Sequence, residues 1–311
     1  MENRKWSDVP LELLALMAEN LGIIALLSFR CVCKDWNFAS ATASAQRESS
    51  KEAWFLVYGE STTCECLLVS NSGEKHSINI PELMGSSTTC LASTKGWLLL
   101  FQNGGSIFFF CPFSRAKIHL PKLPFSEITN HVATFSSPPT SENCVVAVIS
   151  RSCESEELEL NMLQRGADEW TNHTTSWPLS LLGALKGAAF YEGCFSFFDG
   201  VDKVVRFCVE SQDWGFFRLG PVPREKLAAD VKGRLQIFPR REQFASMGMD
   251  RRLGLSEDVS ISTCGTQGSL YGINEVVFCE TIDATESSKT RYLKGVWIQP
   301  RFFQVSPTHS W

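Results

Sequence analysis

The sequence predicts a mainly β protein that begins with a small α-helical domain. Over about the first 45 residues, apolar side chains recur every three or four positions, which is the spacing of an amphipathic helix. Beyond residue 53, short runs of β-branched and aromatic residues alternate with Gly, Asn, Ser and Pro turn signals. Hydrophobic residues make up 44% and charged residues 20% of the 311 positions, so the chain can build a large globular core.

A first helix is predicted to start near Pro10. Proline suits the first helical turn, where its missing N–H has no partner, and Ser7 and Asp8 are good N-cap residues. Gly22 is expected to end this helix, because glycine tolerates a left-handed backbone. The apolar residues expected to share one face of the helix are Leu13, Leu14, Met17 and Leu21.

Two more short helices are expected before residue 45. An apolar segment spans residues 23–29. The apolar side of the third helix comprises Val32, Cys33, Trp36 and Phe38. Three short helices in about 35 residues cannot bury so many large apolar groups among themselves. Part of this surface must therefore contact another protein or the rest of the chain.

The helical region resembles the F-box, the motif that connects substrate receptors to SCF (Skp–cullin–F-box) ubiquitin ligases. The matching residues are Val9-Pro10, Glu12-Leu13-Leu14, Leu21, Leu26-Leu27 and Val32-Cys33-Lys34-Asp35-Trp36. The chain departs from the family at Val9, where leucine is common, and at Ile23-Ile24-Ala25, where a proline or polar residue usually precedes an acidic one. An acidic residue at a helix start contributes roughly 0.3–1 kcal/mol, so its loss weakens the start of the second helix.

This resemblance implies a domain layout and a binding surface. Residues 1–45 are expected to form the F-box and residues 46–52 a linker to a second domain, residues 53–311. The residues implied to pack on a Skp-type adaptor are Pro10, Leu11, Leu13, Leu14, Leu26, Leu27, Val32, Cys33 and Trp36. An amphipathic helical cap folded onto the second domain would show the same periodicity without this ordered signature.

The second domain is predicted to consist of short strands joined by tight turns. The expected strands span residues 53–58, 66–69, 76–80, 97–101, 107–111, 118–120, 132–135, 144–149, 158–163, 190–198, 204–209, 214–219, 234–238, 259–263, 275–280 and 295–298. Short helical turns are expected at residues 179–185 and 224–230. Turn signals about every 8–12 residues are typical of a sandwich, a barrel or a propeller. The length favours a β-propeller, with about six blades of ~40–45 residues each.

Three segments of this region resemble the F-box-associated domain of a large plant family, which is similar to a kelch-like β-propeller. They are KGWLLL at residues 95–100, FCPFSRAKIHLP at 110–121 and FYEG at 190–193. Cys111 stands where the family pattern has Asn. The resemblance covers about residues 53–220 and is weakest over 224–256, where we expect an altered or incompletely closed blade with exposed strand edges.

Composition and motifs exclude several classes of function. The net charge of −5 leaves no broad basic surface for nucleic acid or an anionic membrane. The N-terminus has no secretory pattern and no apolar run is long enough to span a bilayer, so we expect a soluble cytoplasmic and/or nuclear protein. In such a reducing compartment the twelve cysteines should be mostly small buried hydrophobes, not disulfide partners.

No metal, cofactor or catalytic centre is expected. The pairs Cys31-x-Cys33 and Cys64-x-Cys66 lack a second matching pair that would complete a zinc site. Nucleophile-elbow, phosphate-loop, dinucleotide-binding and zinc-protease motifs are missing, and the five histidines are scattered through different predicted strands and loops. The sequence therefore predicts a protein that is not an enzyme.

Together these patterns predict the substrate-recognition subunit of an SCF ubiquitin ligase. Its F-box would bind the Skp-type adaptor, and through it a cullin, while the propeller would bind a target protein. The alternative is a propeller scaffold or sequestering protein outside a ligase, suggested by the altered start of the second helix. A small-molecule-binding or hydrolytic propeller would need titratable residues that converge on the central channel. The first two readings differ in whether Leu13, Leu14, Val32 and Trp36 face an adaptor or fold back on the propeller.

Overall fold

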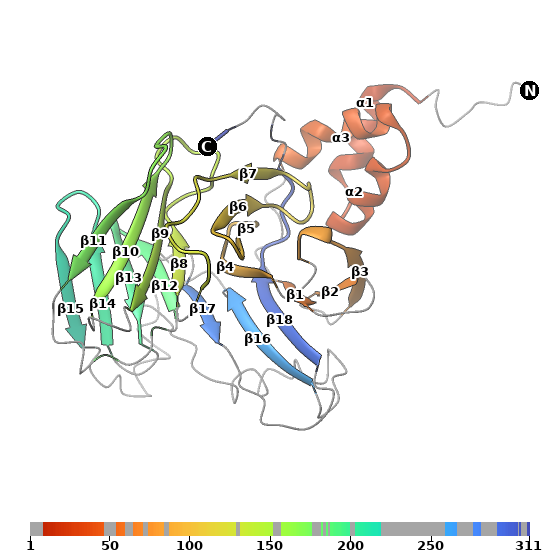
Figure 1. Ribbon diagram of the computed structural model, residues 1–311. Helices are drawn as coiled ribbons and strands as arrows, with labels where there is room; N and C mark the ends of the chain where they lie inside the picture. The colour runs from red at the N-terminus through yellow and green to blue at the C-terminus, as the bar shows by residue number, and fades with distance from the viewer. Residues whose placement is uncertain are drawn as a thin grey trace, which may run out of the picture.

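The protein is mainly β, with three helices at the N-terminal end of the described chain (Figure 1). The computed structural model describes residues 9–46, 54–59, 65–70, 74–83, 87–128, 131–151, 157–175, 182, 185, 187–199, 203–218, 259–265, 276–280, 291–303, 305 and 310–311. The helices are α1 (Leu11–Glu19), α2 (Ile23–Arg30) and α3 (Lys34–Gln46). Because residues 47–53 lie outside the described chain, the limits 1–45, 46–52 and 53–311 stay predictions.

Most strands are grouped in antiparallel units of four. One sheet contains β4 (Thr88–Thr94), β5 (Trp97–Gln102), β6 (Ser106–Phe110) and β7 (Lys117–His119). A second contains β8 (Val132–Phe135), β9 (Val145–Arg151), β10 (Leu158–Gln164) and β11 (Thr171–Thr175). Two more such units belong to a larger ten-stranded sheet.

The ten-stranded sheet joins the two ends of the β-domain. Its order is β15-β14-β13-β12-β17-β16-β18-β1-β2-β3. One end is a hairpin series of β12 (Gly187–Tyr191), β13 (Cys194–Phe198), β14 (Lys203–Cys208) and β15 (Trp214–Arg218). The other end holds β18 (Arg291–Ile298), β1 (Trp54–Gly59), β2 (Glu65–Val69) and β3 (Lys75–Asn79). Between them lie β17 (Val276–Glu280) and β16 (Val259–Gly265).

The arrangement of the units is that of a β-propeller, as the sequence predicts. Strand β4 adjoins β8, β8 adjoins β12, and β4 also adjoins β16, β17 and β18. Strands β4, β8, β12 and β18 therefore lie toward a common centre, and the other strands of their units lie farther out. Strand β18 closes the ring by pairing antiparallel with β1, from Trp54 opposite Ile298 to Gly59 opposite Leu293.

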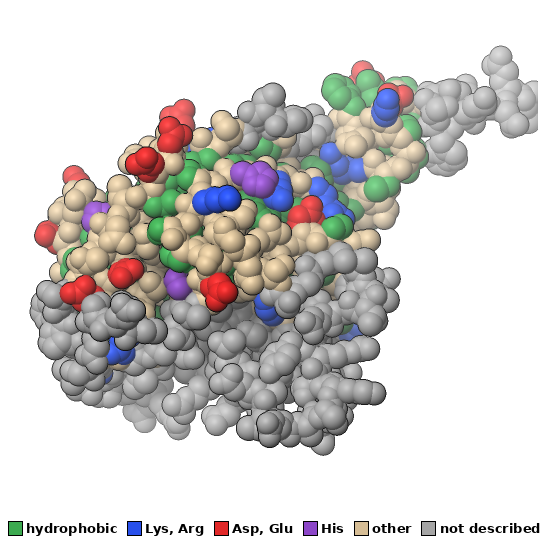
Figure 2. Space-filling model, viewed as in Figure 1, with side chains coloured by type: hydrophobic (Ala, Val, Ile, Leu, Met, Phe, Trp, Pro, Cys, Tyr) green, Lys and Arg blue, Asp and Glu red, His purple; other side chains and the backbone are tan. Residues whose placement is uncertain are grey.

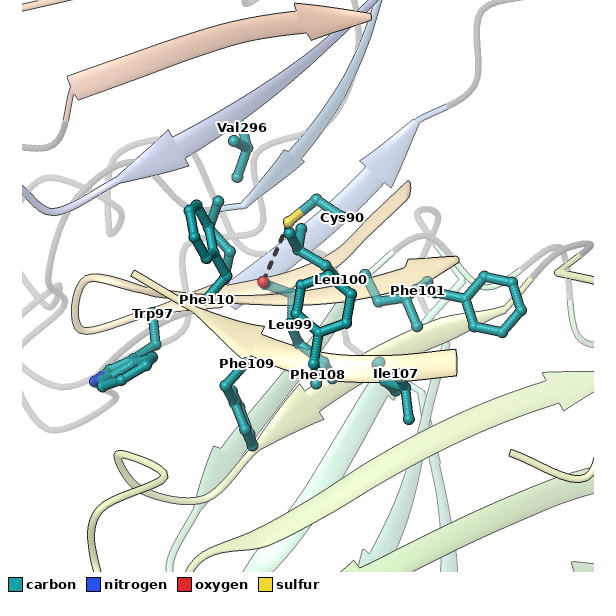
Figure 3. Packing of buried hydrophobic residues seen from close by; sticks show 14 of the residues in the cluster. Cys90, Trp97, Leu99, Leu100, Phe101, Ile107, Phe108, Phe109, Phe110 and Val296 are labelled. Atoms are coloured by element: carbon teal, nitrogen blue, oxygen red, sulfur yellow. Dashed lines mark hydrogen bonds between the residues drawn. The ribbon is translucent and has the colours of Figure 1, made fainter. Parts of the chain in front are cut away.

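The main core lies in and around the β5–β6 hairpin (Figure 3). The labelled residues of this hairpin, all fully buried, are Trp97, Leu99, Leu100, Phe101, Ile107, Phe108, Phe109 and Phe110. The two strands form continuous apolar runs because both of their faces are covered. The strands predicted at residues 97–101 and 107–111 are thus confirmed, and a turn at residues 103–105 joins them.

Two strands and one turn differ from the prediction. Strands β4 and β11 were not predicted, because their sequences, TTCLAST and TNHTT, are rich in small or polar residues. Each is nevertheless a member of a four-stranded sheet. The single run expected at 190–198 contains a turn at Glu192 and Gly193, which both have positive φ. The elements expected at 179–185, 224–230 and 234–238 lie wholly or mainly outside the described residues.

Of the eight cysteines whose side chains the structure describes, four follow the prediction, two are exposed and two form a disulfide. Cys66, Cys90, Cys111 and Cys144 are buried and free. Burial raises the pKa of the Cys66 and Cys144 thiols to about 11, so both thiols are neutral near pH 7. Cys194 and Cys208, by contrast, form a disulfide, because the β13–β14 register places their Cα atoms opposite each other, 4.0 Å apart.

Two glycines with positive φ provide a test of the packing against the segment that follows β18. Gly96 has φ of +84° and Gly104 has φ of +97°. A Cβ at Gly96 would lie 2.7 Å from the Arg301 Cβ, whereas a Cβ at Gly104 would meet no atom within 4 Å. Alanine at Gly104 should therefore lower the free energy of unfolding by only about 1–2 kcal/mol, the cost of the positive φ.

Alanine at Gly96 should cost a further ~1–3 kcal/mol, because the segment after β18 must move away. Denaturant unfolding of the Gly96→Ala and Gly104→Ala variants measures the difference. Equal losses of stability would contradict the close approach of Arg301 to this turn.

Candidate functional site on the N-terminal helices

The three helices enclose a small core of their own. Its buried members are Leu14, Ala18, Leu26, Phe29 and Ala39, and Val9, Leu21 and Trp36 pack against them. The rings of Phe29 and Trp36 lie 4.4 Å apart, centre to centre. So few buried residues cannot cover every apolar side chain of the helices, which leaves some of them on the surface.

The local structure of α1 confirms a helix start near Pro10, although Pro10 is itself the N-cap and Ser7 and Asp8 lie outside the described residues. It also corrects the predicted end. The carbonyl of Pro10 accepts hydrogen bonds from the backbone N–H groups of Leu13 and Leu14, both at 3.1 Å. Asn20 ends the helix, and its side-chain amide donates to the Leu16 carbonyl at 2.8 Å. Gly22 has φ of −67°, so the expected left-handed closure is wrong; this residue is the N-cap of α2.

Helix α1 presents apolar side chains on two different faces. Leu14 and Ala18 point into the helical core and are 1% and 0% exposed. Leu13, Leu16 and Met17 lie on the outer face and are 53%, 57% and 44% exposed. We call these three residues the α1 ridge. Their spacing of three and four positions brings them together on the helix surface, where such an apolar patch marks an interaction site.

Other apolar groups extend the exposed surface of the helical domain. Leu11 and Val32 are exposed, and Phe38 on α3 is 72% exposed. Figure 2 shows apolar side chains gathered on this domain, away from the body of the propeller. Removing such side chains from water is favourable, so this exposed surface of the helical domain is suited to binding a protein.

The structure divides the nine residues predicted to bind the adaptor into two groups. The exposed members are Pro10, Leu11, Leu13, Val32 and Cys33. The remaining four are the buried Leu14 and Leu26, and the partly covered Leu27 and Trp36. Adaptor binding by these residues stays a prediction, and in this arrangement the first group offers the surface for it.

Three exposed large apolar residues of the described helices are not among the nine: Leu16, Met17 and Phe38. The spacing of Leu13, Leu16 and Met17 could have predicted a second apolar face of α1, because these positions lie apart from Leu14 and Ala18 on the helix. Phe38 follows the Val-Cys-Lys-Asp-Trp signature by two positions, and the pattern alone does not indicate whether its ring is covered.

Helix α2 is covered by the propeller on one side. Ile23, Ile24 and Leu27 pack against the main hydrophobic core of the β-domain. The guanidinium of Arg30 lies 3.9 Å from the centre of the Phe302 ring and donates to Ser40 Oγ at 2.9 Å. Partial burial lowers the pKa of Arg30 from its ordinary value. Thus α2 folds back on the propeller, whereas the α1 ridge does not.

Other kinds of site find little support in the part of the chain that the structure describes. Within these residues, His, Cys, Asp and Glu side chains nowhere gather in threes around a possible metal position. Cys31 and Cys33 are both exposed. None of the described helices combines the length and apolarity required to cross a membrane.

Neighbouring leucines on α1 provide a test of the two faces. Replacing the buried Leu14 by alanine should lower the free energy of unfolding of the helical domain by about 2–5 kcal/mol. Replacing the exposed Leu13 by alanine should change it by about 0.5 kcal/mol or less. Thermal unfolding followed by circular dichroism at 222 nm, where helices dominate the signal, compares the two variants. A larger loss for Leu13→Ala would reverse the assignment of the faces.

The family match covers most of the β-domain. The sequence model of the KIB1-4 beta-propeller matches residues 67–281, which is more than half of the chain. Among solved structures, apo AztD from Citrobacter koseri aligns with 52% of this chain and 47% of its own at 14% identity, with a TM-score of 0.32. A TM-score this low adds nothing to the family match.

Curated relatives come from Arabidopsis thaliana. F-box/kelch-repeat protein At3g18720 is 26% identical over 180 residues, 53% of this chain and 44% of the relative. F-box protein At4g00893 is 26% identical over 218 residues, 69% of this chain and 54% of the relative. F-box/kelch-repeat protein At1g57790 is 30% identical over 169 residues, 54% of this chain and 46% of the relative. The chain spans about half the length of these relatives, and their names confirm the resemblance to plant F-box proteins.

Proposed function

Because this chain belongs to the KIB1-4 β-propeller family, and because its relatives are F-box proteins, we propose that it is the substrate-recognition subunit of an SCF ubiquitin ligase. The three helices act as an F-box that binds a Skp-type adaptor and, through the adaptor, a cullin. The propeller binds a target protein for ubiquitination. The protein works in the cytoplasm and/or nucleus and contacts neither nucleic acid nor membrane.

The observation that carries this proposal is the apolar surface that α1 leaves uncovered. Leu13, Leu16 and Met17 are each about half exposed. Full burial of such a side chain contributes ~1.5–3 kcal/mol, so covering the exposed half of each contributes roughly 1 kcal/mol. Val32 and Phe38 add comparable area. Together, the burial of these five side chains would supply a large share of the ~8 kcal/mol that corresponds to micromolar affinity. The entropic costs of association must be subtracted from this sum.

In this role the protein needs no catalytic group of its own. A receptor that holds a target beside the charged conjugating enzyme raises the effective concentration of the target's lysines near the reactive thioester. The chemistry belongs to the other subunits. We therefore propose a non-catalytic subunit that requires no metal or cofactor.

The scaffold alternative was suggested by the apolar residues at the beginning of α2. Their contacts in the structure provide a physical reason for these residues. Ile23 and Ile24 replace the usual polar and acidic residues because they pack against the propeller core. The replacement therefore lies on the side of the helical domain that faces the propeller, and the α1 ridge keeps its apolar character. We accordingly favour the ligase subunit over a scaffold with a vestigial F-box.

A pull-down with a purified Skp-type adaptor tests the proposal. We expect the wild-type chain to bind, and Leu13→Asp to weaken binding by more than about tenfold, because an unpaired carboxylate would be buried at the interface. Ala25→Asp is the matched control, since Ala25 is exposed on α2 and an acidic residue near a helix start is favourable.

Circular dichroism must show that both variants keep the wild-type fold. If the folded wild-type chain does not bind the adaptor, the ligase assignment fails and the scaffold becomes the working function. If Leu13→Asp binds as well as Ala25→Asp, the α1 ridge is not the adaptor surface.

A further inference from the structure

The segment that follows β18 connects the propeller with the helical domain. Phe303 stacks on Trp97 of the propeller, with ring centres 5.0 Å apart. Its neighbour Phe302 also packs against the propeller core, and its ring lies in addition against Arg30 of α2, with 3.9 Å between the guanidinium carbon and the ring centre. In Figure 1 the trace after β18 runs from the sheet toward the helices. Phe302 therefore contacts both the propeller and the helical domain.

The base of this segment is held firmly by the propeller. The Cys111 thiol donates to the Arg301 carbonyl, with 3.4 Å between sulfur and oxygen. Farther along, the Trp311 ring stacks on Phe109 at 5.6 Å. Arg165 donates to the Ser310 carbonyl at 3.1 Å, and its guanidinium lies 5.6 Å from the centre of the Trp311 ring. Phe302 is thus presented to α2 from a fixed position.

The residues of α2 that contact the β-domain recur at the spacing of a single helix face. Ile23, Leu27 and Arg30 recur at intervals of four and three residues, so they lie along one face of the helix. Ile23 and Leu27, together with Ile24, pack against the propeller core. Leu26 and Phe29 point into the helical core instead. Helix α2 is therefore shared between the two cores.

We propose that Phe302 is a positioning residue that, with the Ile23, Ile24 and Leu27 face of α2, sets the orientation of the helical domain on the propeller. This inference rests on the proposed function, because the orientation decides where a target on the propeller lies relative to an adaptor on the α1 ridge. Tethering accelerates a transfer only when the geometry allows the two groups to meet. The contact then determines which target lysines come within reach of the conjugating enzyme.

The test measures a distance distribution between the two domains in the full-length chain. Spin labels are introduced through a noncanonical amino acid at Asn37 of α3 and Ser77 of β3, which are both exposed. Pulsed electron paramagnetic resonance should show one narrow distance peak for the labelled chain without further substitutions. Phe302→Ala should lose that narrow peak and show a broad distribution, because the aromatic contact with Arg30 is gone.

Phe303→Ala is the matched control, one residue away. Its ring packs on Trp97 within the propeller, so this variant should lower the melting temperature yet keep the narrow peak. Arg30→Met provides a second test from the helix side, since it removes the charge over the Phe302 ring and retains the length of the stem. If Phe302→Ala and Arg30→Met both keep the wild-type distribution, the inference is overturned.

A second readout separates this inference from the proposed function. The α1 ridge does not include Phe302 or Arg30, so both variants should bind a Skp-type adaptor as the wild type does. Broad distances with intact adaptor binding support the positioning role. A wild-type chain that fails to bind the adaptor would remove the ligase function, while the distance measurement would still decide whether Phe302 orients the helices.

Discussion

The antiparallel pairing of β18 with β1 is the constraint on which the rest of the structure depends. It joins strands that lie more than two hundred positions apart in the sequence, and it pairs the first described strand with the last one. Without it, β1 and β18 would each present unpaired backbone groups at an open edge. The ladder also sets the path of the chain beyond Ile298, which passes over Gly96 toward the helices.

Sequence patterns predicted the parts of the fold in which local and tertiary preferences agree. The β5–β6 hairpin has aromatic and aliphatic strands around a Gly-Gly turn. Its burial in the core agrees with the apolar character of these side chains. Strand β11 is the opposite case. Its sequence TNHTT has little β signal of its own, and it forms a strand because β10 offers a free edge for pairing.

The candidate site was predictable in its composition but not in its sidedness. Periodicity placed Leu13, Leu14 and Met17 on one face of α1, but the structure buries Leu14 and exposes Leu13 and Met17. The prediction was wrong because the patterns of two apolar faces on one helix overlap. Which face is covered depends on α3, which packs beside α1 and receives Leu14. For the same reason the Ile23-Ile24 start suggested a defect from sequence alone, whereas contact with the propeller explains it.

The position of β18 near the end of the described chain has a consequence for synthesis on the ribosome. The helices emerge first, and their contacts are short in range, so they can fold while the propeller is still being made. The partner surface for Ile23, Ile24 and Leu27 is complete only after β18 and Phe302 have emerged. A nascent chain therefore leaves this α2 face exposed to water until β18 and Phe302 have emerged and the ring has closed.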